Sequence, residues 1–214
     1  MFSIIFHPLF MVAYMLIVFM LVNPYLFISN DTKATGLLVI SILTLSIFFP
    51  MVCIALMKMI GLISSFNMED SKERVGPLIA TGLFYIWLYL NIKDNTIIPD
   101  IFTHFLLGSI IALFISFFFN NFTKISLHSV AIAGMCTSLL MLKFVFGYNE
   151  FLLTIRSFGS YLVNVDFLII IGILLTGIIG TSRLFLKAHT NEQIYGGYFV
   201  GFFSQVIAYF IVFI

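Results

Sequence analysis

The sequence predicts an all-α fold, a polytopic transmembrane helical bundle with six or seven spans, and two observations support this prediction. First, 62% of the 214 residues are hydrophobic and only 9% are charged, whereas a soluble domain carries about 25% charged residues. Second, long apolar stretches alternate with short polar breaks along the whole chain. This small number of charges cannot cover a surface that meets water on every side. We therefore expect the protein to lie in a bilayer.

The apolar stretches have the length that a bilayer requires, because about 20 helical residues cross a hydrocarbon core about 30 Å thick. Each is free of charge through its centre, where a Lys or an Asp would cost about 2.5–3.5 kcal/mol. The first stretch lacks a basic segment and a small-residue cleavage site, so we expect a retained span rather than a signal peptide. Seven candidate spans lie near residues 8–28, 36–60, 78–93, 101–119, 129–147, 165–183 and 194–214.

These spans are expected to be helices because hydrocarbon leaves no partner for an unpaired backbone group. Strands of a membrane barrel would alternate polar and apolar residues over about 10 positions, and these stretches do not alternate. Segment 148–164 is half apolar and contains Arg156, so we interpret it as a segment along the membrane interface. Gly197 and Gly201 predict a close approach between helices. No linker, repeat or low-complexity tract divides the chain, so residues 1–214 are expected to form one membrane-embedded domain.

Several residues have a simple packing interpretation. The net charge of +1 gives no basic footprint for nucleic acid. Cys53 and Cys136 lie inside apolar stretches without metal-type spacing or a disulfide framework, so we expect buried packing residues. His7 and His104 lie within or near apolar stretches without charged neighbours. We expect both to be hydrogen-bonded packing histidines.

Alternating spans place the polar breaks at 67–77, 120–128 and 183–193 on one side of the membrane, which we call side A. The positive-inside rule would make side A cytoplasmic. Half of its basic residues are candidate site residues placed for chemistry, so charge alone does not orient the protein. Side A holds Lys58, Lys72, Arg74, Lys124, Arg183 and Lys187, and the opposite side holds Lys33, Lys93, Lys143 and Arg156.

The last side-A break brings an Arg, a His and a Gln to the membrane boundary. If residues 189–193 begin a helix, His189 and Gln193 share a face, and Gln193 can hold the imidazole in one tautomer. Arg183 offers a planar fork suited to phosphate oxygens. In the alternative interpretation, Arg183 and Lys187 only reach toward the interface and His189 is a boundary residue.

The residue order in this break resembles the third motif of the type-2 phosphatidic acid phosphatase superfamily, a family of membrane lipid phosphatases. That motif is Ser-Arg, five residues, His, three residues, Asp, then a hydrophobic residue and a Gly. Gln193 stands where the family has Asp, which replaces a charged orienting group by a neutral one. The matching positions are Ser182, Arg183, His189, Ile194 and Gly197.

Two further stretches carry parts of the family's other motifs. The family's second motif is Pro-Ser-Gly-His, and this chain keeps Ser126 and His128 of it. It has Leu127 where the family has Gly, and so it lacks the residue that allows close backbone approach to a phosphate. All three stretches fall on side A, two spans apart, as a shared active site requires. For the motif Lys, six residues, Arg-Pro, the chain offers suitable residues at a different spacing, namely Lys72, Arg74 and Pro77.

The resemblance implies a membrane phosphatase without a cofactor or a metal, acting on a lipid phosphate or lipid pyrophosphate. His189 would attack phosphorus, His128 would protonate the leaving oxygen as general acid, and Gln193 would orient His189. Family substrates include undecaprenyl pyrophosphate, phosphatidic acid and phosphatidylglycerol phosphate, and the expected location is a bacterial inner membrane. The residues expected to bind the substrate phosphate are Arg183, Arg74, Lys72 and Ser126.

Two alternatives stay open. The departures at Gln193, at Leu127 and in the first motif are also typical of a relative that binds a phosphorylated lipid without turnover. A small transporter would need ionisable residues or broken helices near mid-membrane. Pro50 and His104 are the features that would suit a transporter.

Overall fold

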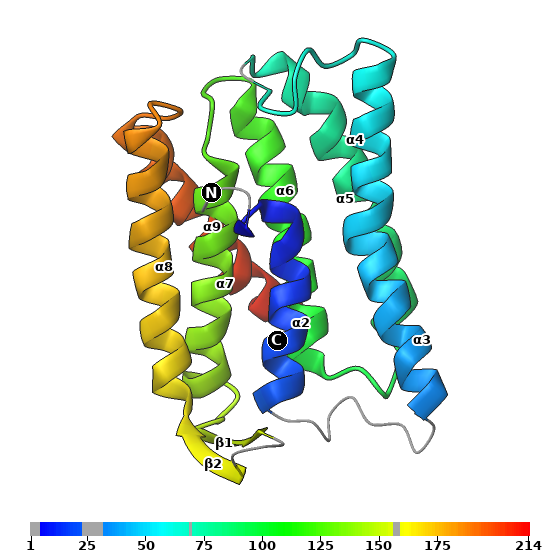
Figure 1. Cartoon of the computed structure of the whole chain (residues 1–214), viewed down its shortest axis with the longest axis vertical. Helices are drawn as coiled ribbons and strands as arrows, with labels where there is room; N and C mark the ends of the chain where they lie inside the picture. Colours follow the sequence, from blue (N-terminus) through cyan, green and yellow to red (C-terminus); the bar gives the residue numbers. More distant parts are fainter. Residues whose placement is uncertain (1–4, 23–31, 69, 156–158) are drawn as a thin grey trace.

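The computed structural model is a helical bundle, so the all-α polytopic prediction is confirmed (Figure 1). It describes residues 5–22, 32–68, 70–155 and 159–214. Within these residues, six helical segments are long and apolar enough to cross a membrane. The protein is therefore a multi-pass membrane protein by the length and composition of its helices.

The helices follow the predicted order, with additional short turns. The π-helical turn η3 joins α3 and α4 into one continuous span. It ends two residues before Pro50, which cannot donate a backbone hydrogen bond. The elements are η1 (Pro8–Phe10), α2 (Met11–Val22), α3 (Thr32–Leu43), η3 (Thr44–Phe48), α4 (Phe49–Met59), η4 (Lys72–Arg74), α5 (Val75–Ile92), α6 (Asp100–Asn120), α7 (Leu127–Phe144), β1 (Glu150–Ile155), β2 (Gly159–Asn164), α8 (Val165–Phe185) and α9 (Asn191–Phe213).

Three segments differ from the expectation. The stretch near 78–93, the shortest predicted span, belongs to a full-length span, Lys72–Ile92. The first predicted span appears as a shorter apolar helix, Pro8–Val22, and its predicted remainder lies outside the described residues. The segment near 148–164 forms the antiparallel hairpin β1–β2 at one end of the bundle. Arg156, the charged residue of that segment, lies outside the described residues.

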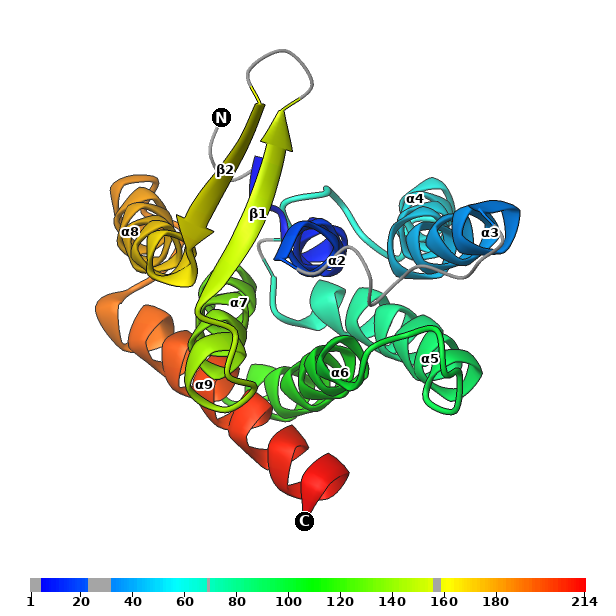
Figure 2. The same cartoon turned by 90° about the horizontal axis from the view of Figure 1, so that it is seen from below.

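Helix α2 lies on the inner side of the bundle, between α7 and the helix formed by α3 and α4 (Figure 2). Met15, Leu16 and Phe19 are almost fully buried in its core. Figure 1 shows that α2 begins well below the end of the bundle at which α5 starts. The residues at the start of α2 therefore lie within the bundle rather than at its end.

Two glycines bring α7 and α9 into close contact. A Cβ on Gly197 would lie 2.9 Å from the Ser126 carbonyl oxygen, and a Cβ on Gly201 would lie 2.2 Å from the Val130 carbonyl oxygen. Only a residue without a side chain fits at such distances, so the predicted close approach is confirmed. This crossing places the start of α9 against the start of α7, where the Ser126 N–H donates to the Gln193 carbonyl at 3.3 Å.

Candidate active site

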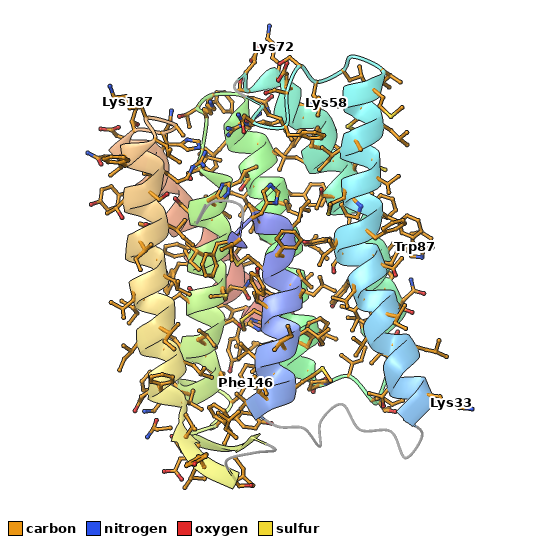
Figure 3. All side chains as sticks on the ribbon, in the orientation of Figure 1. Lys33, Lys58, Lys72, Trp87, Phe146 and Lys187 are labelled. Carbon is orange, nitrogen blue, oxygen red and sulfur yellow. The ribbon has the colours of Figure 1, made fainter. Side chains whose placement is uncertain are left out.

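The predicted motif residues belong to segments at one end of the bundle. The loops that precede α5, α7 and α9 all lie at this end (Figure 1). Figure 3 shows Lys58, Lys72 and Lys187 at the same end and Lys33 at the opposite end. The described structure therefore groups these lysines as the alternation of spans predicts.

His189 is held in one orientation by two acceptors. It lies between α8 and α9 and is only 7% exposed. Its Nδ1 lies 2.9 Å from Gln193 Oε1 and 3.1 Å from the Lys124 carbonyl oxygen. The Thr190 N–H also donates to Gln193 Oε1, at 3.3 Å, which fits an oxygen at that position. Because both neighbours accept, Nδ1 carries the ring hydrogen, and the lone pair of the neutral ring is on Nε2.

Burial and nearby charge keep His189 neutral. Burial is the main cause that lowers its pKa from 6.5 to about 4. The positive charges of Arg74 and Arg183 lower this pKa further, while the hydrogen bonds from Nδ1 to Gln193 and Lys124 partly oppose them. At pH 7 the imidazole is therefore uncharged, and its Nε2 lone pair is available to attack an electrophile.

Arg74 is a buried cation fixed by backbone carbonyls. It is 6% exposed. Its Nε–H donates to the Met68 carbonyl at 3.1 Å and an Nη1–H donates to the Ile125 carbonyl at 3.2 Å. No carboxylate of the described residues forms an ion pair with it. A buried cation without a counter-charge is costly, so this position favours an anion with several acceptor oxygens.

Arg183 supplies the second positive charge from the last turn of α8. A cation there is favourable because the carbonyl end of a helix carries partial negative charge. The side chain is half-buried, and its charge acts on both His189 and His7. The charges of Arg74, at the end of η4, and of Arg183, on α8, thus act on the same imidazole.

The α7 end contributes His128 and Ser126 in different ways. His128 is half-buried in the first helical turn, and its ring meets the His7 ring edge-on, with 5.6 Å between centroids. Ser126 is fully buried as the N-cap residue of α7. Its Oγ accepts hydrogen bonds from the Ser129 N–H at 3.4 Å and the Ser129 hydroxyl at 3.0 Å. Ser126 therefore shapes the start of α7 rather than lining an open site.

Lys72 lies apart from the other predicted phosphate-binding residues. Its side chain is exposed and extends away from the end of the bundle (Figure 3). Its backbone N–H donates to Asp70 Oδ1 at 3.0 Å. The structure thus brings Arg74 and Arg183 toward His189, but it does not bring Lys72 there.

His7 is a neighbour of the site that the sequence interpretation missed, because we expected a packing histidine. It is the N-cap residue of η1 and lies against His128. A His-Pro pair opening an apolar helix was the available signal, since Pro favours the first position of a helix.

By contrast, His104 is fully buried and its Nε2–H donates to the Gln205 carbonyl at 2.9 Å, which agrees with the predicted packing role.

A cavity of about 70 Å³ runs between α2, α5, α6, α7 and α9. Pro8 and Leu127, the sequence neighbours of His7 and His128, line it. Farther along the bundle, Gly134 and Phe105 also line it. Leu127 and Gly134 are two helical turns apart, so the cavity extends about 10 Å along α7. Its walls are mostly hydrocarbon.

Comparison of the chain with protein-family models, curated proteins and solved structures finds no match. The interpretation of the site therefore depends on the geometry of its own residues. Within the part of the chain that the structure describes, no three His, Cys, Asp or Glu side chains are grouped as ligands for a metal ion.

Proposed function

We propose that this protein is an integral membrane phosphatase that hydrolyses a lipid phosphate or lipid pyrophosphate through a phosphohistidine intermediate. The observation that carries the proposal is the hydrogen bonding of His189, whose Nδ1–H donates to the Gln193 side chain and to the Lys124 carbonyl. Its Nε2 lone pair is available beside the positive charges of Arg74 and Arg183. This combination suits attack on an anionic phosphorus centre, because the two cations attract the anion toward the imidazole and stabilise its charge. An isolated neutral imidazole lacks this stabilisation.

In the first step, His189 Nε2 forms a bond to phosphorus as the bond from phosphorus to the leaving oxygen breaks. His128 gives its proton to that oxygen. Arg74 and Arg183 hold the non-bridging oxygens and stabilise the charge that builds on them. In the second step, water attacks the phosphohistidine, His128 takes a proton from the water, and the P–N bond breaks to release phosphate.

The cavity supports a lipid as the substrate. Its mostly apolar wall includes Pro8 and Leu127, the sequence neighbours of His7 and His128, and continues along α7 to Gly134. A hydrocarbon chain that follows this wall would leave the phosphate to the arginines. Undecaprenyl pyrophosphate, phosphatidic acid and phosphatidylglycerol phosphate have this chemistry, and they fit a role in lipid metabolism in a bacterial inner membrane. These substrates and this location come from the family resemblance.

The test is phosphate release by purified protein from a panel of lipid phosphates, with and without vanadate. Vanadate resembles five-coordinate phosphorus and should inhibit. His189→Ala should abolish release, and Arg183→Ala should lower kcat about 10²–10³-fold, as expected for loss of one charge-stabilising group. Lys187→Gln is the matched control, because Lys187 is an exposed cation four residues after Arg183. Equal release by wild type and His189→Ala would refute the proposal.

A second candidate function is binding of a phosphorylated lipid without turnover. It is favoured by the neutral amide on His189 Nδ1 and by the pKa of about 4, which together indicate a weakly basic nitrogen. Under this alternative, wild-type protein would bind the lipid phosphate with Arg74 and Arg183 but release no phosphate. Binding and release measured on the same preparation distinguish the two functions.

A further inference from the structure

His7 interacts with two of the residues on which the proposed function depends, through a ring contact with one and through charge with the other. Its ring meets His128 edge-on at a centroid distance of 5.6 Å. The positive charge of Arg183 acts on it. His128 and Arg183 are the proposed general acid and one of the two phosphate-binding arginines, so His7 lies on the border of the proposed phosphate site.

The hydrogen bonding of His7 determines which ring nitrogen carries a hydrogen. The Leu9 backbone N–H donates to His7 Nδ1 at 3.4 Å. A backbone N–H can only donate, so Nδ1 provides the lone pair and the neutral ring carries its hydrogen on Nε2. Burial first, and then the charge of Arg183, lowers the pKa of His7 below 6.5. At neutral pH the ring is therefore an uncharged Nε2–H donor.

An uncharged donor suits a site that already holds two cations. A third positive charge would be repelled by Arg74 and Arg183, whereas a neutral N–H adds a hydrogen bond to phosphate without this repulsion. His7 also lies at a junction, because the next residues, Pro8 and Leu9, line the apolar cavity. His7 thus feels the charge of Arg183, and the two residues that follow it line a path that would suit a hydrocarbon chain.

We propose that His7 is a substrate-binding residue of this site, whose Nε2–H donates a hydrogen bond to the phosphate group at the point where the lipid chain joins it. The inference rests on the proposed function for its substrate. It adds a third imidazole to His128 and His189, and the segment that precedes α2 becomes part of the active site rather than only a packing element.

The kinetic test compares two replacements. His7→Phe keeps a ring to pack against His128 but removes the donor, and it should lower kcat/KM about 10- to 100-fold, the value expected for a hydrogen bond to a charged group. His7→Gln keeps an N–H donor and should recover part of that loss. Tyr14→Phe is the control, because it removes an anchor of the same segment, the hydroxyl bond to the Ile5 carbonyl.

Two kinetic results would overturn the inference. One is a His7→Phe enzyme as active as wild type. The other is a Tyr14→Phe enzyme as impaired as His7→Phe, which would show that the segment matters only for structure. Recovery by His7→Gln is the result that a packing role does not produce.

A binding readout separates this inference from the proposed function. Inorganic phosphate is titrated into the full-length protein in detergent while ¹⁵N-labelled histidine signals are followed by NMR, with His7→Phe assigning the His7 ring. We expect the His7 Nε2 signal to move with the same apparent Kd as the His189 signal. A fixed His7 signal beside a moving His189 signal would refute the inference. Movement of both in a protein that releases no phosphate would refute only the phosphatase.

Discussion

The side-chain acceptor on His189 Nδ1 influences how basic the opposite nitrogen is. In this chain that acceptor is the neutral Gln193 amide oxygen at 2.9 Å, where the resembling family has a carboxylate. A neutral acceptor fixes the tautomer but does little to stabilise the positive charge that develops on the ring during attack. Gln193 thus orients the His189 ring but does little to make its Nε2 lone pair more basic.

Gln193→Glu tests this effect, because it keeps the length of the side chain and adds a charge. A carboxylate at this distance should raise the pKa of His189 by roughly 1–3 units, from its value of about 4. Histidine NMR titration measures the change, and the acidic limb of the profile of kcat/KM against pH should move up with it. Gln193→Leu should instead lower activity, since it leaves only the Lys124 carbonyl to orient the ring. An unchanged pKa in Gln193→Glu would show that Gln193 does not control His189.

At this scale, the sequence predicted local pairs better than distant ones. The His189–Gln193 contact followed from a spacing of four residues, and the structure has it. His7 was missed because its sequence neighbours are apolar, while His128 and Arg183 come from distant parts of the chain. Ser126 matched the family motif, yet its hydroxyl is used to cap α7. A motif position does not reveal whether a side chain is already occupied by the backbone beside it.

At the scale of elements, the crossing of α7 and α9 holds the two histidine segments together. Ser126 and Gln193 are joined by a backbone hydrogen bond at 3.3 Å, and this bond requires the close approach at Gly197 and Gly201. A Cβ on Gly201 would lie 2.2 Å from the Val130 carbonyl oxygen and 2.8 Å from the Gly134 nitrogen. Both are backbone atoms, which cannot move aside as a flexible side chain can.

Gly201→Ala should therefore separate the starts of α7 and α9. We expect a loss of about 1–3 kcal/mol in the free energy of unfolding, as for other overpacked positions, and a larger fractional loss of phosphate release. Gly196→Ala is the matched control on the same helix, since its Cβ would meet only Ile125 Cδ1 at 3.9 Å. Unfolding in detergent with increasing denaturant gives the stability. Equal effects of the two substitutions would contradict the crossing.

The hairpin shows why one element escaped prediction. Phe151 is buried and the next residue, Leu152, is 57% exposed, as alternation along a strand requires. The exposed Leu152 pairs with Leu162, which is also exposed. Because both faces carry apolar residues, the sequence does not alternate visibly between polar and apolar. The long helices were predictable because length and the absence of central charges are sufficient signals in a bilayer.

At the scale of the whole molecule, the two ends of the bundle differ in structure. The end with Lys72 and Lys187 holds the site, and the end with Lys33 holds the hairpin (Figure 3). All three lysines are exposed. Replacing each by Cys, in a chain with Cys53 and Cys136 changed to Ala, allows labelling of intact vesicles with an impermeant maleimide. We expect positions 72 and 187 to react from one face and position 33 from the other. Labelling of all three from one face would contradict the arrangement.

The cavity extends along α7 from Leu127, the neighbour of His128, to Gly134. If the lipid chain of the proposed substrate occupies it, filling the cavity should affect substrates according to their chain length. Ala131 is half-buried and lines the cavity, and a phenyl ring there would occupy the path of a hydrocarbon chain. Each buried methylene contributes about 0.8 kcal/mol, so exclusion of two methylenes corresponds to roughly a tenfold loss. Ala131→Phe should therefore lower kcat/KM for a long-chain lipid phosphate roughly tenfold or more.

A short-chain phosphate provides the internal comparison, because it reaches the arginines without entering the cavity. Its hydrolysis by Ala131→Phe should match that of wild type. Leu174→Phe is the control for a larger ring on the outer surface, since Leu174 is 59% exposed on α8. It should leave both substrates unaffected. Equal loss for both substrates in Ala131→Phe would mean that the ring distorts His128 and His189 instead, and no loss for either would show that the hydrocarbon chain follows another path.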